Sequence, residues 1–307
     1  MNTHVVVGAG PVGTHLARLL LARGEHVRVV TRRGTGPAGA ELTALDAAHA
    51  PALAAACVDA AAIYNCVNPA YHRWATDWPP IADALVAAAQ ANGAVLATTG
   101  NLYPYGPVTG PIVEGLPDAA TGTKGRVRAA MTRQALQAHR DGRIRAVEVR
   151  GSDYLGGSSL LSAVVTPALR KGRTAYVPAD LDAPHSWTSV ADVARLLATV
   201  AEHESAWGRI WHVPSAPPVS IRTLAQMAAD RLGTPLKLRA MPYAVLWAAG
   251  MVVPVARELR ETQYQFRAPF VLDASDAQDT FGLAPAPLEQ SLALDLDPTS
   301  SATGGPA

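Results

Sequence analysis

A glycine-rich turn near the amino terminus constrains the fold more than any other feature of this sequence. Residues 8–13 read Gly-Ala-Gly-Pro-Val-Gly, directly after the apolar stretch His4–Val7 and at the start of a helical pattern. In such a turn the first glycine permits a tight bend, the second lets the backbone approach a pyrophosphate, and the third lets helix and strand pack closely. A purely structural turn is the alternative. The pattern predicts a dinucleotide site formed by Gly8, Gly10, Pro11, Val12 and Gly13.

The first 150 residues alternate short apolar runs with alanine-rich helical stretches. Strands that are apolar throughout and separated by helices indicate a parallel sheet covered on both faces. Right-handed crossovers then give an α/β, Rossmann-like, doubly wound fold. The expected strands are His4–Val7, His26–Thr31, Ala61–Asn65, Ala94–Thr99 and Ile144–Val149, and the expected helices are Val12–Ala22, Pro51–Val58, Pro80–Ala91 and Lys124–His139.

After Gly151 the alternation gives way to proline, glycine and short strands, which indicates a smaller, irregular carboxy-terminal substrate lobe. We expect a dinucleotide-binding domain at 1–157 with 185–205 returning to it, and a substrate lobe at 158–184 and 206–290. The small, polar residues 297–307 predict a disordered tail. The helices expected here are Leu160–Arg170, Val190–Ala201, Ile221–Leu232 and Tyr243–Met251.

Charge and cysteine content exclude several classes of partner. The chain has 26 basic and 25 acidic residues, so its balance gives no reason to expect nucleic acid or a membrane as partner. Cys57 and Cys66 cannot build a disulfide framework, and no histidine pattern suggests a metal site. The apolar run at 243–256 is too short to span a bilayer, and a secretory signal is absent from the first residues. We expect a reduced, cytoplasmic protein, monomer or homodimer, with a small-molecule substrate.

The end of the second expected strand bears on the choice of cofactor. An acidic residue at this place holds the ribose 2′-hydroxyl of NAD, whereas arginine accommodates the 2′-phosphate of NADP. Here the strand ends in Thr31, Arg32 and Arg33, without a carboxylate. Guanidinium groups offer forked donors and permanent charge. The segment favours NADP(H) over NAD, with a solvated basic loop as the alternative.

Further motifs resemble the extended or atypical short-chain dehydrogenase/reductases of the NAD-dependent epimerase/dehydratase family. The resemblance extends to about residue 290 and implies the fold described above. It also implies that Asn68 and Lys124 contact the cofactor. The motifs are the glycine turn, Asn68-Pro69, the Tyr-Pro-Tyr-Gly turn at 103–106, Lys124, and the segments Arg150–Gly157 and His185–Leu197.

The resemblance also implies a Tyr-x-x-x-Lys pair, in which lysine holds the ribose and lowers the pKa of the tyrosine. Lys124 stands at the lysine position, but Ala120 stands at the tyrosine position and Asn101 replaces the family's serine. Lysine occurs only three times among the 26 basic residues, which favours a cofactor role for Lys124 over an ordinary surface position. We predict Lys124, Tyr103 and Asn101 as the catalytic groups. Tyr103 would supply the proton, with its pKa lowered by Lys124, unless it merely packs over the cofactor. A bound water, Tyr105, Tyr71 or Tyr154 are the alternatives.

Aromatic side chains after these turns predict a pocket for an aromatic or polycyclic substrate. Capping of the sheet and structural histidine are the alternatives. The residues predicted to bind substrate are Tyr71, Trp74, Tyr105, Tyr154, His185 and Trp187.

Three functions follow from these observations. The first is an NADPH-dependent oxidoreductase that reduces a carbonyl or activated double bond of a small metabolite. The second is a non-catalytic NADP-binding sensor resembling NmrA-like proteins, or a reductase scaffold that steers a non-redox step. The third is a sugar-nucleotide epimerase or dehydratase, against which Ala120 and the two arginines at 32 and 33 argue.

Overall fold

A parallel sheet of seven strands forms the centre of the molecule in the computed structural model, which describes residues 2–252 and 254–296. The strand order is β10-β6-β5-β4-β1-β2-β3, so the direction of winding reverses between β1 and β4. The doubly wound α/β fold is thereby confirmed. The strands are β1 (Thr3–Val7), β2 (His26–Thr31), β3 (Glu41–Ala44), β4 (Ala60–Asn65), β5 (Val95–Asn101), β6 (Arg145–Gly151) and β10 (Ile210–His212).

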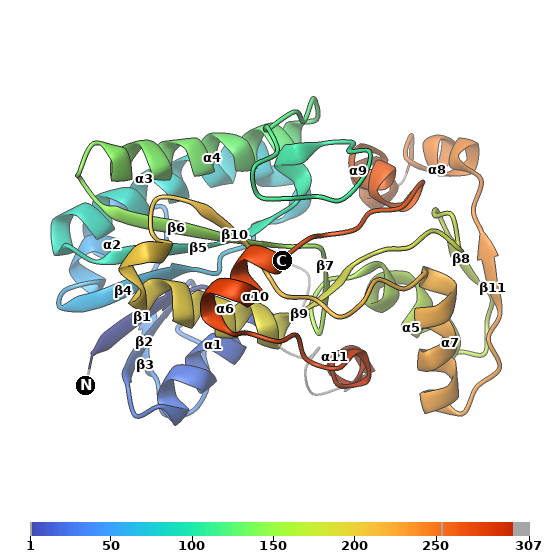
Figure 1. Ribbon diagram of the computed structural model, residues 1–307, viewed down its shortest axis with the longest axis horizontal. Coiled ribbons are helices and arrows are strands. Elements are labelled where there is room, and N and C mark those ends of the chain that lie inside the picture. Colours follow the sequence, from blue (N-terminus) through green and yellow to red (C-terminus); the bar gives the residue numbers. More distant parts are fainter. Residues whose placement is uncertain (1, 253, 297–307) are drawn as a thin grey trace.

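Helices cover both faces of the sheet. Figure 1 shows α3 (Trp74–Asn92) and α4 (Thr123–Arg140) above it, and α1 (Pro11–Ala22) and α6 (Val190–Glu202) below it. Alternate residues of β1 serve the two cores. Val6 belongs to a buried cluster with residues of α1 and α6, whereas Val5 belongs to one with residues of α3 and of α2 (Ala50–Ala56). This double burial explains why the strand is apolar at every position.

Helix α3 begins at Trp74, six residues before the predicted start at Pro80. Proline normally ends a helix because it lacks an N–H group, which is why the sequence favoured the later start. Pro79 and Pro80 lie in the second turn of α3. Trp74 and Trp78 precede them at a spacing of four residues, and both indoles are buried against the sheet. This burial stabilises the first turn despite the two prolines.

The two edge strands β3 and β10 were not predicted from the sequence. Both are short, and β3 is largely exposed, so neither shows the continuous apolar run of a central strand. β10 pairs with β6 in the central sheet, although residues 206–290 were expected to belong to the second lobe.

Most of the remaining described residues form a second region with its own core, whereas α10 (Ser275–Phe281) packs on the central core through Ala277 and Phe281. The buried side chains of the second region include Leu161, Val177 and Leu224. The expected helix at 160–170 starts as a π-helical turn at Leu161–Val165. The tail predicted at 297–307 lies outside the described residues. The elements are the strand pairs β7 (Asp153–Leu155) with β9 (Trp187–Ser189) and β8 (Ala175–Val177) with β11 (Leu238–Ala240), and the helices α5 (Thr166–Arg170), α7 (Ile221–Leu232), α8 (Tyr243–Ala249), α9 (Pro254–Thr262) and α11 (Leu288–Leu296).

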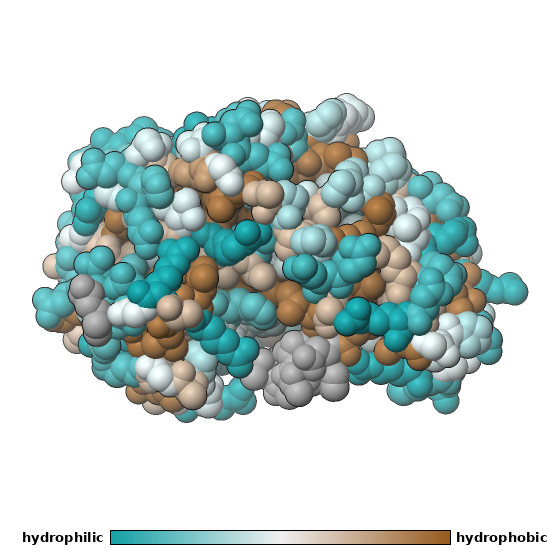
Figure 2. Space-filling model, turned by 60° about the horizontal axis from the view of Figure 1, so that its bottom comes forward, coloured by the Kyte–Doolittle hydropathy of each residue, from teal (hydrophilic) through white to brown (hydrophobic). Residues whose placement is uncertain are grey.

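Short 3-10 turns connect these elements at Tyr71–Arg73 (η1), Tyr103–Tyr105 (η2), Glu204–Ala206 (η4) and Gln263–Phe266 (η5). The face in Figure 2 is mostly hydrophilic, with apolar residues between the polar ones. Across the described ranges, no helix combines the length and apolar character needed to cross a membrane.

Candidate functional site

A cleft of about 150 Å³ opens at the carboxyl ends of the central strands. It lies where the strand order reverses, which is the place where open α/β sheets bind their ligands. Nine of the predicted site residues line it. They are Gly10, Pro11, Val12, Asn68, Tyr71, Trp74, Asn101, Tyr103 and Tyr154.

The three glycines of the turn occupy three different environments. A Cβ atom on Gly8, whose φ is +101°, would lie 2.6 Å from the carbonyl oxygen of Cys66. A Cβ on Gly13 would lie 1.9 Å from the carbonyl oxygen of Gly8. By contrast, a Cβ on Gly10 would have no heavy atom within 4 Å, and Gly10 lines the cleft. The space beside Gly10, at the start of α1, therefore fits a pyrophosphate on the helix amides.

Thr31, Arg32 and Arg33 lie beside this turn rather than in the cleft itself. The amide of Gly8 donates to the carbonyl of Val30, which fixes the end of β2 next to the glycine turn. The Thr31 hydroxyl accepts from the amide of Thr35 at 2.8 Å. Arg32 and Arg33 are exposed, and neither forms an ion pair with another described residue.

Tyr71 and Tyr103 meet in the cleft through a short hydrogen bond between their hydroxyls. Burial raises the pKa of Tyr71 to about 12. Burial and the neighbouring Tyr71 also raise the pKa of Tyr103 well above its ordinary value. The prediction that Lys124 lowers the pKa of Tyr103 is wrong for this arrangement, because desolvation dominates. At neutral pH both phenols are hydrogen-bond donors rather than bases.

Lys124 is the second residue of α4 and is 3% exposed, but it does not line the cleft. Its Nζ lies 3.3 Å from Oε2 of Glu261 on α9, and Oε1 of the same carboxylate accepts from its backbone N–H at 2.5 Å. The Nζ also lies 5.3 Å from the centre of the Tyr71 ring. The carboxylate of Glu261 therefore offsets the positive charge of Lys124, which weakens the effect of that charge on a nearby phenol.

Asn101 ends β5 and supports the turn that carries Tyr103. Its Oδ1 accepts from the backbone N–H of Tyr103 at 3.2 Å. Ala120 lies against the same turn, because its amide donates to the carbonyl of Pro104 at 3.0 Å. Asn101 thus positions the tyrosine of the cleft, and no hydroxyl stands at position 120.

Two lining residues, Asp153 and Arg128, were missed by the sequence analysis. Asp153 begins β7, its Oδ2 accepts from the amide of Leu160 at 3.1 Å, and burial raises the pKa of its carboxyl to about 7. Its Oδ1 makes no hydrogen bond with any described residue. After burial and their mutual contact, the negative charge of Asp153 also raises the pKa of Tyr71 and of Tyr103, so the three acidic groups share one environment.

Arg128 lies one helical turn after Lys124, a spacing that places both side chains on one face of α4. This spacing is the signal that could have identified Arg128. Its guanidinium donates to the carbonyl of Thr99 and lies 4.9 Å from the centre of the Trp78 ring. Arg128 is 5% exposed and places a permanent positive charge at the inner end of the cleft.

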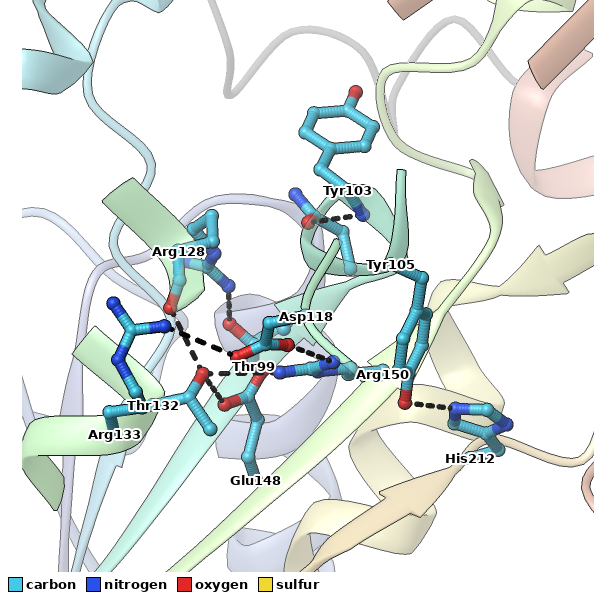
Figure 3. Close-up of polar contacts among 12 residues, drawn as sticks. Thr99, Tyr103, Tyr105, Asp118, Arg128, Thr132, Arg133, Glu148, Arg150 and His212 are labelled. Carbon is cyan, nitrogen blue, oxygen red and sulfur yellow. Dashed lines mark hydrogen bonds and ion pairs between the residues drawn. The ribbon is translucent and has the colours of Figure 1, made fainter. Parts of the chain in front are cut away.

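The two tyrosines of the Tyr-Pro-Tyr-Gly turn point in different directions, as Figure 3 shows. Tyr103 points away from the buried charges, whereas Tyr105 points to His212 and its hydroxyl lies 2.8 Å from Nε2 of that histidine. Tyr105 is 1% exposed, so it does not bind substrate as predicted. Tyr154 lines the cleft, but its hydroxyl donates to the carbonyl of Gly100.

The group facing Tyr105 is a buried ion pair. Nε of Arg150 lies 2.9 Å from Oε1 of Glu148, and Arg150 is fully buried. Thr132 donates to the other oxygen of Glu148, and Asp118 lies 3.5 Å from Nη1 of Arg150 (Figure 3). The network joins α4 and β6 beneath the cleft, and it supports the cleft without lining it.

His185 and Trp187, predicted to bind substrate, instead belong to the buried interior of the second region. The His185 ring stacks on Phe266 and Phe270, with centroids 4.8 and 5.6 Å away. Burial lowers the pKa of His185 to about 3. Trp187 is 2% exposed and donates to the carbonyl of Val219. Neither side chain lines the cleft. The described residues contain no cluster of potential metal ligands.

The glycine turn, the strand order and the cleft together define a dinucleotide-binding α/β protein. The family model of the NAD dependent epimerase/dehydratase family matches residues 4–213, which is more than half of the chain. The chain therefore belongs to this family, as the resemblance implied. Among curated protein sequences none matches it.

Solved structures of similar fold include three sugar-nucleotide enzymes. A UDP-glucose 4-epimerase of Thermotoga maritima, determined with UDP-glucose, has a TM-score of 0.78 and 15% identity over 96% of this chain and 97% of its own. A UDP-glucose 4-epimerase of Thermus thermophilus, determined with NAD, has a TM-score of 0.76 and 17% identity over 96% of this chain and 98% of its own. A dTDP-glucose 4,6-dehydratase of Bacillus anthracis, also determined with NAD, has a TM-score of 0.77 and 13% identity over 96% of this chain and 96% of its own. At such identities the likeness shows the fold.

Proposed function

We propose that this chain binds a nicotinamide dinucleotide in the cleft and acts as an epimerase or dehydratase on a sugar nucleotide. One observation carries the proposal. Gly10 opens onto the same cleft that holds the hydroxyls of Tyr71 and Tyr103 and the carboxyl of Asp153. The family and the relatives with UDP-glucose or NAD favour this reaction over the NADPH-dependent reduction of a carbonyl that the sequence analysis put first.

Different residues of the chain bind the cofactor, orient the substrate and transfer the proton in this proposal. When bound, the nicotinamide supplies reversible hydride transfer. The amides at the start of α1 hold the pyrophosphate beside Gly10. Tyr71 and Tyr103 are both protonated at neutral pH. One hydroxyl donates to the other, and the remaining O–H donates to the reacting oxygen and orients it. Asp153 accepts a proton at its Oδ1 and returns it, because a pKa of about 7 leaves both protonation states populated.

Asp153 thus replaces the tyrosine that is absent at position 120. This assignment differs from the prediction that Tyr103 supplies the proton. The different environments of the two groups support this assignment, because burial raises the pKa of the Tyr103 phenol well above its ordinary value and that of the Asp153 carboxyl to about 7.

NADP(H) is the preferred cofactor within this proposal. Arg32 and Arg33 are exposed at the end of β2, next to the glycine turn, and no carboxylate stands in the segment Thr31–Arg33. Their forked donors suit a 2′-phosphate. The same arginines favour the second candidate, an NADPH-dependent reductase, since NADPH is the reductant of net reductions.

Two measurements test the proposal in sequence. Thermal melts with NADP, NADPH, NAD and NADH come first, where a ligand at 100 times its dissociation constant stabilises the protein by about 2.7 kcal/mol. NMR of UDP-glucose and dTDP-glucose incubated with the protein and the stabilising nucleotide follows. The expected result is a new sugar signal from the product. The Asp153→Asn variant should form this product about 100-fold more slowly, which is the usual contribution of an acid–base group.

The alternatives give different results. Consumption of NADPH by a panel of carbonyl compounds, with the sugar nucleotides unchanged, identifies the reductase. Nucleotide binding without turnover of either class identifies a sensor, which the residues at 101 and 120 would suit. No stabilisation by any nucleotide, in protein shown to carry none, refutes the proposal.

A further inference from the structure

An exposed apolar surface lies on α8 and the turn after it. Residues 240–256 contain no charged side chain. Four large apolar residues are exposed there: Val245 by 51%, Trp247 by 52%, Met251 by 70% and Val252 by 81%. We call these four residues the α8 patch. Surface helices of globular proteins normally turn polar side chains to water, so this concentration needs an occupant.

Leu246 shows that the helix itself is seated on the protein. It is 3% exposed, while its neighbours Val245 and Trp247 are both about half exposed. The inner side of α8 is therefore already packed. The outer side carries the α8 patch, whose side chains have no further surface of the described chain to cover them.

Arginines surround the α8 patch. The guanidinium of Arg260 lies 4.7 Å from the centre of the Trp247 ring, and Nε of Arg257 donates to the carbonyl of Gly250 at 3.2 Å. Arg267 lies 3.9 Å from the centre of the Tyr243 ring. All three belong to α9 and the residues that follow it, directly beside α8.

Residues 257–267 hold these three arginines and two glutamates, Glu258 and Glu261. Glu261 is engaged by Lys124, and Asp180 lies near Tyr243. Arg260 is also unusual, because its Nε and Nη2 are buried without a hydrogen-bond partner among the described residues. Two unsatisfied donors of a cation beneath an exposed indole favour an anionic ligand over water.

We propose that the α8 patch binds the surface of membranes that contain anionic lipids. Its apolar side chains would enter the boundary between headgroups and acyl chains, and the arginines would lie at the phosphates. Insertion of Trp247 would uncover the donors of Arg260 for phosphate oxygens. The near-zero net charge of the whole chain, which predicted no membrane partner, does not show that three arginines lie close together beside an apolar surface.

The position of the α8 patch connects it with the cleft. Figure 1 shows α8 and α9 at the end of the molecule opposite the amino terminus. Glu261 of α9 holds Lys124, and Gln265, four residues later, lines the cleft. The segment beside the α8 patch therefore also contributes to the surroundings of the cleft. The proposal itself is independent of the nucleotide and of the reaction.

Co-sedimentation with vesicles tests the proposal. The probes are vesicles of phosphatidylcholine alone and of phosphatidylcholine with phosphatidylglycerol at about 3:1. We expect binding at least about 10-fold tighter to the anionic vesicles, weakened by 0.5 M salt as exposed charges are screened. The double variant Trp247→Ser/Met251→Ser should lose at least about 10-fold in binding. Leu42→Ser, which removes another exposed apolar side chain on β3, is the matched control and should bind normally.

Thermal melts of both variants establish that they fold. Absence of binding to anionic vesicles, equal binding to both kinds of vesicle, or unchanged binding of the double variant overturns the proposal. The proposal is also overturned if the wild-type protein is a dimer that does not bind vesicles and the double variant is a monomer. That result would assign the α8 patch to contact with a second copy of the chain.

Discussion

Replacement of Asp153 by Asn should stabilise the protein in a pH-dependent way. Burial raises the pKa of the Asp153 carboxyl in the folded protein from 3.8 to about 7. Between these two values the unfolded chain has lost the proton that the folded chain retains. The free energy of unfolding therefore falls as pH rises from about 4 to about 7 and is constant above. Asparagine has the shape of the neutral carboxyl and no charge, so the variant escapes this loss.

The magnitude follows from the same difference. A pKa about 3 above the ordinary 3.8 corresponds to about 4 kcal/mol at 1.36 kcal/mol for each unit. Asp153 is partly exposed to the cleft, where solvent screens the charge, so we halve the value to about 2 kcal/mol. The bond from the Leu160 amide persists in the variant, because the Asn Oδ1 accepts it equally well. At about 2–4 °C for each kcal/mol, the melting temperature should rise by about 4–8 °C at pH 8.

The assay compares urea unfolding of both proteins at pH 4.5, 6, 7 and 8. The variant should exceed the wild type by about 2 kcal/mol at pH 8, with the gap closing towards pH 4.5. Asp77→Asn is the control, because Arg73 lowers the pKa of that exposed carboxyl and its loss should not stabilise the protein at high pH. A gap of the same size at every pH, or a variant less stable than the wild type at pH 8, would refute the reasoning.

Three further predictions concern the cofactor turn and the buried ion pair. Gly10→Val should abolish the stabilisation of the protein by nucleotide, because the valine side chain occupies open space in the cleft. The melting temperature of the nucleotide-free variant should stay within about 2 °C of the wild-type value. Gly115→Val, whose Cβ also meets no atom, is the control and should bind nucleotide normally in the same melts. Arg32→Glu/Arg33→Glu should weaken NADPH binding at least about 10-fold and NADH binding much less, as titration calorimetry would measure; equal losses for both would contradict the 2′-phosphate assignment. Arg150→Met should lower the free energy of unfolding in urea by about 3–5 kcal/mol, because it leaves Glu148 buried without its partner. Arg209→Met, which breaks an exposed ion pair with Asp276, should lower it by less than about 1 kcal/mol.

The central fold could be predicted from the sequence because its strands are buried on both faces. β2 was placed at its observed bounds, and β1 and β4 within one residue. Such strands are apolar at each position, which no exposed segment imitates. The same physics hides β3, which is largely exposed, and the short length of β10, with three residues, hides that strand, so neither shows a continuous apolar run. For α3, a local rule about proline opposed the burial of two tryptophans, and burial prevailed.

The site could be predicted only where function depends on the backbone. The glycine turn specifies its own conformation, so its place at the cleft followed from the residues alone. Tyr103 and Tyr105 are separated by one residue, and nothing in the sequence tells which of them faces the cleft. Asp153 carried no visible signal either, because its importance comes from desolvation, which arises only when segments distant in the chain pack around it.

The turn η2 ties the cleft to the outermost strand of the sheet. Pro104 alone separates Tyr103, which faces the ligand space, from Tyr105, which is anchored to His212 on β10. The fixed φ of proline limits the backbone freedom between the two tyrosines. We therefore expect a ligand that displaces the backbone of Tyr103 to disturb the hydrogen bond at His212. The edge strand β10 lies far from the glycine turn in strand order. The amide hydrogen exchange rates of β10 should nevertheless change when a ligand binds in the cleft.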